Sequence, residues 1–489
     1  MGIIIKQSIK GSFWSYLGVV IGFITTSYLY PNYLTTETVG LFGLISAYTV
    51  LLSEFSALGF HAVTARLFPY FRNEKKGHNG FVFILIIVIL IGFLLVTSAF
   101  YILKPWIIES NIEKSKIFAD YIYLLLPLTL FTLLYNQFDI YNKLLYDAVF
   151  GTFLQEFLQR IMILIVTLLY AFHIINLNQF IIAFACVLCL KGLVLLLYLL
   201  IKGDISIMPQ LSFLNNNLIS EMISVALYGI LAGIGGSIVF SIDKIIINQM
   251  LGLASTGVYT IAFFFGTLVI IPSRTLIRIS GTLIAEAFKK NDLKYISEIY
   301  HKSCLTQLII GAFIFGGIWL NIENIISILG PEYNEARWVI FFIGLGYLVD
   351  MTTGANGQII AYSKHYKVAL LFILILIVLV IILMYILVPK WGITGGAIAI
   401  AFSIIMNNIM RALFLKVKYD MQPFVWKFLV IIGVAIFAYT ISSILPIQKK
   451  ILPDILFRSS VFTVIYTILI FRLKVSNDIN QALLKIINR

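Results

Sequence analysis

Two arginines one helical turn apart stand inside an apolar stretch of the chain and could bind phosphate. Arg274 and Arg278 lie four positions apart, so on a helix they share a face with Cβ atoms about 5–6 Å apart. A guanidinium group binds phosphate oxygens through two parallel hydrogen bonds, and two such groups in tandem suit a diphosphate. The alternative is that both side chains reach toward lipid headgroups, since this apolar stretch ends near Gly281.

An acid and a base stand together in the stretch SIDKIIINQML. Asp243 and Lys244 are neighbours, and neighbours on a helix diverge by about 100°, so they need not pair with each other. A charge near the centre of a bilayer costs about 2.5–3.5 kcal/mol on the insertion scale. Each is therefore expected beside water or a partner, either on a central cavity or at a membrane interface.

Four further ionisable groups lie in apolar stretches. Lys191 and Asp350 have no partner nearby in sequence, which favours places on a cavity. Glu54 and His61 are seven positions apart and share one face of a continuous helix. This pair could relay protons, line a cavity or serve packing.

Two other charged positions favour structural roles. Glu156 and Arg160 are four positions apart, so they can neutralise each other along one helix. Arg411 lies near the end of an apolar run, where its side chain is expected to reach the interface. The predicted substrate-binding residues are therefore Arg274, Arg278, Lys244 and Lys191, and the predicted coupling or cavity groups are Asp243, Asp350, Glu54 and His61.

The composition requires a membrane to surround these residues. The chain has 489 residues, of which 61% are apolar and 12% charged, whereas soluble domains are about 45–50% apolar and about 25% charged. Its net charge of +13 does not indicate nucleic-acid binding, because the basic residues fall in short gaps between apolar runs. Three cysteines are too few for a disulfide framework. No cleavable signal peptide is expected.

Apolar runs of spanning length predict an all-α polytopic protein with about fourteen transmembrane helices. The predicted spans are 11–33, 40–62, 80–103, 118–138, 150–171, 178–201, 221–246, 256–281, 303–321, 337–361, 367–388, 393–415, 424–445 and 456–473. With the N-terminus in the cytoplasm, basic residues on the inner loops outnumber those on the outer loops about threefold. Both termini are therefore predicted to be cytoplasmic.

The two halves of the chain repeat each other. With Gly18 placed opposite Gly235, an offset of 217, the segments 18–44 and 235–261 align without a gap, and Gly40 meets Gly257. Further on, LYLLIKGD faces LFLKVKYD at an offset of 216. Duplication of a six-helix unit predicts two lobes inserted the same way round, with substrate between them and alternating access.

The repeat also sets the predicted domains and the asymmetry between them. These are an N-terminal lobe 1–204, a cytoplasmic linker 205–220, a C-terminal lobe 221–420, and two final helices with a cytoplasmic tail in 421–489. Strong bases are concentrated in the seventh and eighth spans, so the predicted cavity is cationic. Nucleotide-binding, zinc-protease and hydrolase motifs do not occur in the sequence. No enzyme activity, metal or cofactor is expected.

The stretch D-K-I-I-I-x-x-x-L-G-x-x-x-x-G-V-Y-x-x-A, from Asp243 to Ala262, resembles the junction of the seventh and eighth helices in polysaccharide flippases. These are the O-antigen-type (Wzx-like) branch of the multidrug/oligosaccharidyl-lipid/polysaccharide (MOP) exporter superfamily. The fourteen spans, the two lobes and the basic loop EAFKKNDLKYISEIYHKS are similar too. The resemblance covers nearly the whole chain.

This resemblance implies a flippase for undecaprenyl-diphosphate-linked oligosaccharides of O-antigen, capsule or exopolysaccharide type. Its location would be the bacterial cytoplasmic (inner) membrane. Its partners would be the lipid-linked oligosaccharide, membrane lipids, and a polysaccharide polymerase with its chain-length protein. An ion gradient would drive it, with the ion left open. By analogy, Arg274, Arg278 and Lys244 would line the cavity.

Three alternatives remain open from the sequence. A lipid II-type wall-precursor flippase handles the same lipid diphosphate. An ion-coupled multidrug antiporter of the same superfamily typically has twelve spans and an acid in the first helix, which is uncharged here. A membrane acyltransferase or polymerase would need a catalytic histidine or a large outer loop.

Overall fold

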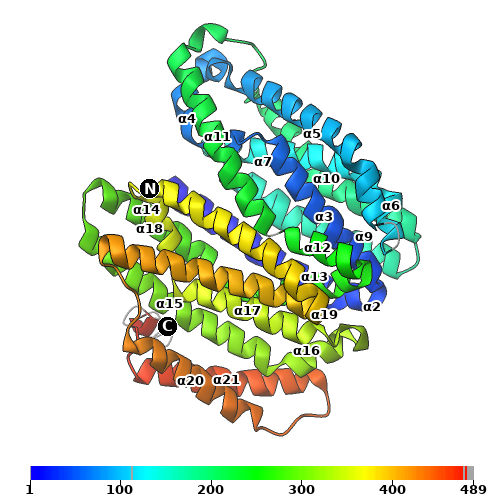
Figure 1. Ribbon diagram of the computed structural model, residues 1–489, viewed down its shortest axis with the longest axis vertical. Helices are drawn as coiled ribbons and strands as arrows, with labels where there is room; N and C mark the ends of the chain where they lie inside the picture. The colour runs from blue at the N-terminus through cyan, green and yellow to red at the C-terminus, as the bar shows by residue number, and fades with distance from the viewer. Residues whose placement is uncertain (1, 112–113, 240, 477–478, 482–489) are drawn as a thin grey trace. The chain divides into compact units, whose positions relative to one another are not determined.

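Every regular element in the described part of the chain is helical (Figure 1). The computed structural model describes residues 2–111, 114–239, 241–476 and 479–481, so the end of the predicted tail lies outside the described residues. Long apolar runs form the helices, and glycines with positive φ end or interrupt them. Gly59 (φ 69°), Gly203 (φ 79°), Gly354 (φ 55°) and Gly392 (φ 56°) are such positions.

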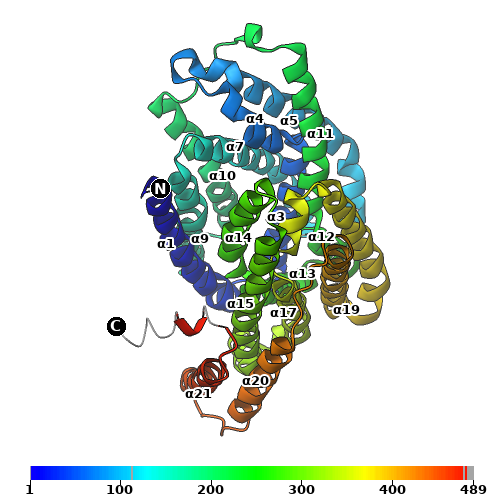
Figure 2. The ribbon, with the colours of Figure 1, turned by 90° about the vertical axis from the view of Figure 1, so that its left-hand side faces the viewer.

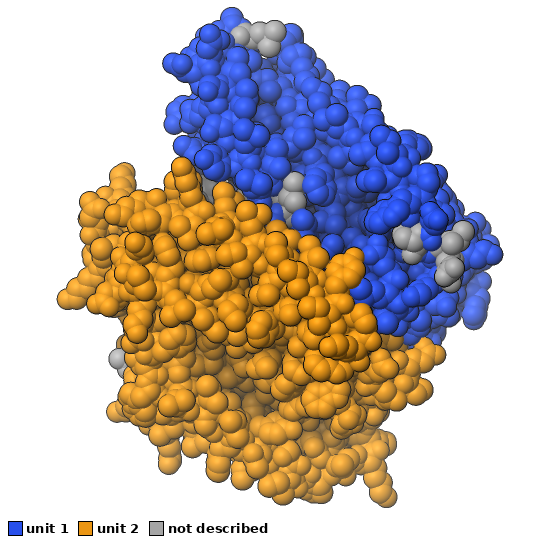
Figure 3. Space-filling model, in the orientation of Figure 1, with its two compact units in different colours: residues 1–257 blue, residues 258–489 orange. Residues whose placement is uncertain are grey.

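The chain forms two compact units, residues 1–257 and 258–489 (Figure 3). Unit 1 contains α1 (Gly2–Ile24), α2 (Tyr30–Tyr33), α3 (Thr36–Ser56), α4 (Phe60–Phe71), α5 (Phe81–Asn111), α6 (Lys116–Tyr121), α7 (Leu125–Leu144), α8 (Ala148–Thr152), α9 (Gln159–Ala171), α10 (Leu177–Lys202), α11 (Asn216–Val239) and α12 (Ile242–Leu251). π-Helical turns at Thr25–Leu29 and Phe153–Leu158 interrupt its first and fifth spans.

Unit 2 begins within α13 (Leu253–Thr267). It continues with α14 (Ser273–Lys289), α15 (Leu293–Leu320), α16 (Ile322–Leu329), α17 (Ala336–Thr352), α18 (Asn356–Tyr362), α19 (Tyr366–Tyr419), α20 (Trp426–Ser443) and α21 (Ile451–Arg472). The predicted domain boundary at 204 follows the sequence repeat and stays a prediction. The compact unit reaches Gly257 because α11 and α12 pack on α3, α4 and α5.

Twelve of the described helices are long and apolar enough to cross a membrane, or thirteen if the bent pair α17 and α18 forms one span. The chain is thus a multi-pass membrane protein, and the predicted count of fourteen stays a prediction. α19 has 54 residues, which at 1.5 Å per residue is about 80 Å, far beyond a hydrocarbon core of about 30 Å. Its backbone leaves helical geometry at Trp391 and Gly392.

Aromatic rings fill the core of unit 1 on its α4 and α5 side, next to α7. Phe68, Phe71 and Tyr141 all pack around Phe81, and all four side chains are fully buried. α7 and α10 lie side by side in both ribbon views (Figures 1 and 2). This packing positions α4, which carries His61, and α10, which carries Lys191.

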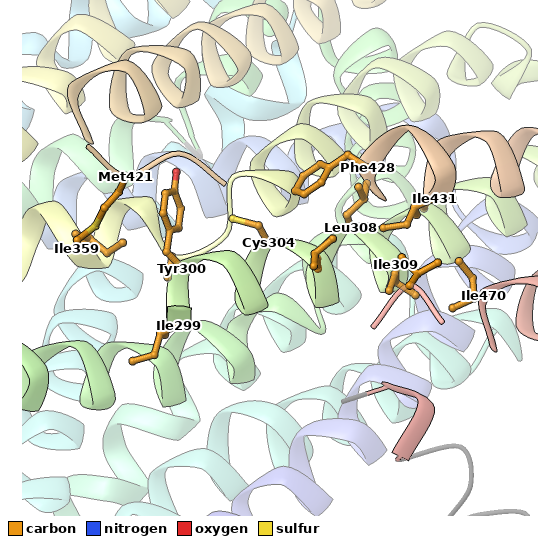
Figure 4. Close-up of a cluster of buried hydrophobic side chains, with 14 of the residues drawn as sticks. Ile299, Tyr300, Cys304, Leu308, Ile309, Ile359, Met421, Phe428, Ile431 and Ile470 are labelled. Atoms are coloured by element: carbon orange, nitrogen blue, oxygen red, sulfur yellow. The ribbon is translucent and has the colours of Figure 1, made fainter. Parts of the chain in front are cut away.

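The core of unit 2 is built on α15 (Figure 4). Leu308 and Ile309 of α15 pack with Ile431 of α20 and Ile470 of α21. The hydroxyl of Tyr466 on α21 donates to the Ile309 carbonyl at 2.8 Å. The last two helices are therefore packed against α15 within this unit (Figure 2).

The element bounds repeat at the offset found in the sequence. A shift of 217 carries Thr36, the first residue of α3, onto Leu253, the first residue of α13. The same shift carries Phe71, the last residue of α4, onto Phe288 at the end of α14. A shift of 216 carries α10 onto 393–418, the second part of α19.

Two repeat-related glycines contact each other inside unit 1. A Cβ on Gly40 would lie 2.0 Å from the Leu253 oxygen, and a Cβ on Gly257 would lie 1.9 Å from the Thr36 oxygen. Each would also lie 3.0 Å from the backbone nitrogen of the other glycine. Gly40 contacts Leu253 in the same way as Gly257 contacts Thr36, and the offset of 217 relates Gly40 to Gly257 and Thr36 to Leu253. The contact is therefore locally two-fold symmetric.

Candidate functional site

Arg274 and Arg278 lie at the start of α14, because the predicted eighth span is broken. α13 ends at Thr267, and α14 begins after Pro272, whose ring cannot supply a backbone N–H. Ser273 fixes this start on α15 by donating its hydroxyl to the side-chain oxygen of Gln307 at 2.5 Å. The prediction of one continuous helix over 256–281 is therefore wrong at this point.

Both guanidinium groups are exposed and one turn apart. Among the residues that the structure describes, neither forms an ion pair with a carboxylate. The first turn of α14 also carries no acid, although helix N-termini favour acids and disfavour bases. The arginines therefore add to the positive field of the helix N-terminus and create a local preference for anions.

Asp243 and Lys244 lie in the first turn of α12, whose N-cap residue Ser241 has non-helical backbone (φ −131°, ψ −30°). Asp243 is fully buried, Lys244 is partly buried, and the carboxylate accepts the Lys244 backbone N–H at 2.8 Å. An acid in this position is favoured by the helix N-terminus. The two side chains thus belong to the packing of α12 within unit 1.

Lys191 lies over an aromatic ring between two acids. Its Nζ is 4.9 Å from the centre of the Tyr135 ring, a cation–π distance, and it interacts electrostatically with Glu156 and Asp139. Asp139 also pairs with Lys143 on its own helix. Lys191 therefore has partners that the sequence did not indicate, contributed by α7 and by the π-helical turn at Phe153–Leu158.

The expected pairing of Glu156 with Arg160 is confirmed, with an N–O distance of 2.7 Å. Arg160 also donates to the carbonyl of Gly18 on α1 at 2.9 Å. A Cβ on Gly18 would lie 1.7 Å from the Glu156 carbonyl oxygen. The pair thus lies where the fifth span packs closely on the first, which is a structural position.

Glu54 and His61 form a hydrogen-bonded pair across a break in the second span. α3 ends at Ser56 and α4 begins at Phe60, and between them Leu58 (φ 48°) and Gly59 (φ 69°) have left-handed backbone. His61 Nε2 lies 2.8 Å from Glu54 Oε1, and the side chains are only 19% and 13% exposed. The prediction that one continuous helix face carries both residues is therefore replaced by a contact between two helices.

Helix α11 covers this pair at a glycine. A Cβ on Gly233 would lie 2.0 Å from Glu54 Oε1, so the carboxylate occupies the space that the missing side chain leaves. At the break itself, a Cβ on Gly59 would lie 2.1 Å from the Ala226 carbonyl oxygen of α11. The break and the acid are thus both in close contact with α11.

Replacing Gly233 by alanine is expected to push the Glu54 carboxylate away from His61. The contact is with a side-chain end that can move, so we expect a folded variant that is less stable by about 1–3 kcal/mol. The matched control is Gly236→Ala on the same helix, where no heavy atom lies within 4 Å of a new Cβ. Thermal unfolding in detergent measures the effect, and equal melting temperatures for the two variants would contradict it.

Asp350 lies near the end of α17, where the chain bends by 53° into α18. Its Oδ1 accepts from the amide of Asn408 on α19 at 2.7 Å. The Asn408 oxygen in turn accepts from the Thr353 hydroxyl at 2.8 Å and from the Asn356 amide at 2.9 Å. Arg411 on α19 adds an electrostatic interaction with Asp350, so the bend is held by a buried polar network.

The structure therefore groups the predicted residues differently from the sequence. Arg274 and Arg278 lie together on α14, and Glu54 forms a hydrogen bond with His61. Lys191 and Asp350 acquire partners on other helices. The residues that the sequence analysis did not single out are Tyr135, Asp139, Thr353, Asn356 and Asn408. A usable signal existed for two of them, because Asp139 and Asn408 interrupt apolar runs.

Comparisons with known proteins give one matching family and several solved structures of similar fold. Residues 8–284 match the family described as Polysaccharide biosynthesis protein. An uncharacterized membrane protein of Methanocaldococcus jannaschii is 23% identical over 99% of both chains. The solved structure of the lipid II flippase MurJ in its inward closed conformation gives a TM-score of 0.71 at 16% identity, covering 96% of this chain and 99% of that one.

Two further solved structures extend this likeness. A multidrug resistance MATE family transporter of the MOP superfamily, facing inward, gives a TM-score of 0.65 at 15% identity over 83% of this chain and 98% of that one. A MOP superfamily transporter from Pyrococcus furiosus gives 0.52 at 13% identity over 86% and 93%. At these identities the likeness shows the fold, which is that of MOP-type transporters.

Proposed function

The chain belongs to the polysaccharide biosynthesis protein family, and from this premise we propose that it is a flippase for an undecaprenyl-diphosphate-linked oligosaccharide. It would carry a repeat unit of O-antigen, capsule or exopolysaccharide from the inner to the outer leaflet of the bacterial cytoplasmic membrane. The single observation that carries the proposal is the exposed guanidinium pair of Arg274 and Arg278 at the start of α14.

The proposed architecture has fourteen spans with both termini in the cytoplasm. Two six-helix lobes are inserted in parallel, and α20 and α21 follow them. α19 supplies two spans divided at Trp391 and Gly392, since its length is more than twice the hydrocarbon thickness. The repeat of element bounds and the symmetric contact of Gly40 with Gly257 support the parallel arrangement. Such repeats alternate access by movement of one half against the other.

The chemistry of the pair supports a diphosphate as the recognised group. Two guanidinium groups one turn apart offer up to four N–H donors in two planar forks, which match the oxygens of adjacent phosphates. Their place in the first two turns of α14 adds the partial positive charge of the helix N-terminus. In this proposal Lys244 and Lys191 contribute positive charge to the substrate path, and Lys191 lies over the Tyr135 ring of α7.

Replacing both Arg274 and Arg278 by alanine is expected to lower surface polysaccharide at least ~10-fold at matched expression. Each charge-assisted hydrogen bond is worth about 1.5–3 kcal/mol, and about 1.4 kcal/mol corresponds to a tenfold change in affinity. Lysine at both positions keeps the charge without the planar fork and should retain part of the export. The measurement is surface polysaccharide in a deletion strain that carries each variant.

The matched control is Arg337→Ala, an arginine in the first turn of α17 that forms a partly exposed ion pair with Glu323. It should export as well as the unaltered protein, because surface ion pairs contribute little. Full export by the double-alanine variant would remove the arginine pair from the substrate site.

A lipid II-type flippase is the second candidate, and the fit to the lipid II flippase MurJ over 96% of this chain favours it. Both candidates recognise the same lipid diphosphate and differ in the saccharide. Deleting the gene and identifying the lipid-linked glycan that accumulates on the inner leaflet separates them. Accumulation of the wall precursor would replace the first assignment, whereas accumulation of a polysaccharide repeat unit would support it. A multidrug antiporter would leave both glycans unchanged.

A further inference from the structure

The pair of Glu54 and His61 has a chemistry that neither helix packing nor diphosphate binding explains. At the repeat offset of 217, Glu54 corresponds to Ile271 and His61 to Arg278. The second copy therefore breaks its helix in this region without a carboxylate or an imidazole. Since the architecture does not require these groups, their cost in an apolar environment points to a role in function.

The pair can hold either one proton or two without rearrangement of its heavy atoms. With His61 neutral, one proton lies between Nε2 and Glu54 Oε1, which are 2.8 Å apart. A second proton on Nδ1 converts the hydrogen bond into an imidazolium–carboxylate ion pair. That Nδ1 is buried and has no hydrogen-bond partner in the described part of the chain, so it is the atom left to accept the proton.

Helix α11 packs against the acid of this pair and against the break. Gly233 lies against the carboxylate, and Gly229 lies against the break, where its Cβ would be 2.5 Å from the Gly59 oxygen. While α11 holds this position, water does not reach Nδ1 of His61. Separation of α11 from α3 and α4 opens the site, and return of α11 closes it in whichever protonation state it then has.

The other charged groups near the pair have partners of their own or lie apart. On α3 and α4 themselves these groups are Glu37 and Arg66, with Arg72 directly after α4. On the elements packed against these two helices they are Glu74, Lys75, Lys76, His78, Lys104, Glu109, Lys116, Asp120, Asp139, Lys143, Glu221, Asp243 and Lys244. Arg66 and Glu221 lie 3.8 Å apart on the exposed side of α4 and α11, and Asp139 binds Lys143. From Phe81 to Leu103, α5 carries no charged side chain. The buried exchange of charge is therefore local to Glu54 and His61.

We propose that Glu54 and His61 form a proton-binding site that couples the transport cycle to a proton gradient, an inference that rests on the proposed transport function. The bound proton comes from the aqueous side to which the site is open and leaves to the other side after α11 has moved. The break at Leu58 and Gly59 places the two groups on separate helices. The protonation state thus acts directly on the contact between α3 and α4.

Direct titration tests the site without reference to any saccharide. The full-length protein, labelled with ¹³C at histidine Cε1, is reconstituted in nanodiscs and titrated by NMR from pH 5 to 8. His61→Gln identifies the His61 signal by its loss. We expect that signal to move with pH in the unaltered protein and to respond differently in Glu54→Gln. A His61 signal that does not move over this range would overturn the proposal.

Transport in proteoliposomes tests the coupling, with a fluorescent undecaprenyl-diphosphate disaccharide as the probe. An imposed proton gradient should raise its flipping at least ~5-fold in the unaltered protein. Glu54→Gln and His61→Gln should lose this stimulation, so that their flipping rates with and without the proton gradient become equal. His301→Gln, a partly buried histidine on α15, should keep it. The glutamine variants preserve shape and hydrogen-bonding capacity, so loss of folding is not expected to hide the result.

The outcomes separate the two proposals. Gradient stimulation that persists in His61→Gln would overturn the proton site and leave the flippase assignment intact. No flipping by the unaltered protein under any gradient would overturn the flippase assignment, and the proton site would then be decided by the titration. A response of His301→Gln equal to that of His61→Gln would remove the specific role of the pair.

Discussion

Alanine at Gly40 or Gly257 is expected to abolish export and to lower the yield of folded protein. The new Cβ would lie 2.0 Å or 1.9 Å from a backbone oxygen of the facing segment. Backbone atoms in packed helices cannot move aside as a side-chain end can, so the segments must separate. We expect destabilisation of about 3 kcal/mol or more, at the upper end of the effects of overpacking.

The symmetry of this contact also predicts how the effects of the two substitutions compare and combine. Because Gly40 meets Leu253 as Gly257 meets Thr36, the two substitutions should have nearly equal effects. The double variant should add less than the sum of the singles, since one separation of the segments relieves both clashes. Thermal unfolding in detergent and surface polysaccharide are the two measurements.

Glycines in open space provide the matched controls. No heavy atom lies within 4 Å of a Cβ added at Gly317 on α15 or at Gly433 on α20. Alanine there should leave stability unchanged or raise it slightly, because alanine favours the helix by up to about 1 kcal/mol over glycine. If Gly40→Ala and Gly433→Ala melt alike, the close crossing does not hold the segments together.

The helices were predictable from the sequence, and their interruptions were not. Runs of about 20 apolar residues fix a span because every backbone polar group must be bonded within the helix. The residues that break the second and eighth spans, Gly59 and Pro272, are visible in the sequence, but membrane helices tolerate both types. Only the positive φ of Gly59 against the backbone of α11 shows why the chain breaks there.

The contacts of the candidate site residues were also predictable only in part. Arg274 and Arg278 were predicted together because their spacing alone places them on one face. The partner of Asp350 could not be predicted, since Asn408 lies 58 residues away and reaches it through a helix crossing. Lys191 also has no partner nearby in sequence, and α7 supplies one through the Tyr135 ring. The spacing of residues in the sequence therefore predicts contacts along one helix but does not predict contacts between helices.

Replacing Asn408 by alanine is expected to be the most damaging single loss of a polar side chain in unit 2. Its amide donates to Asp350 at 2.7 Å, and its oxygen accepts from Thr353 at 2.8 Å and from Asn356 at 2.9 Å. Removal leaves the half-buried carboxylate of Asp350 and the buried amide of Asn356 without their partner. An unsatisfied buried group costs about 1–3 kcal/mol. Thr353 retains a bond to the Asp350 carbonyl at 2.9 Å, so it adds little.

The neighbouring asparagine is the control for this prediction. Asn407 is 4% exposed, and its side-chain oxygen is buried without a hydrogen-bond partner in the described part of the chain. Asn407→Ala should therefore cost less than ~1 kcal/mol, since it also removes an unsatisfied acceptor. Thermal unfolding of the two alanine variants gives the comparison, and a smaller loss for Asn408 than for Asn407 would contradict the network.

Asp350→Asn tests whether the Asp350 carboxylate only helps to hold the bend between α17 and α18 or whether its charge is also needed for transport. The amide oxygen can still accept from Asn408, so the 53° bend between α17 and α18 should persist. What is lost is the negative charge beside Arg411, which leaves that guanidinium without its acid. If the network serves only to hold the bend, this variant exports polysaccharide normally. A folded variant with impaired export would assign the carboxylate a role in the transport cycle.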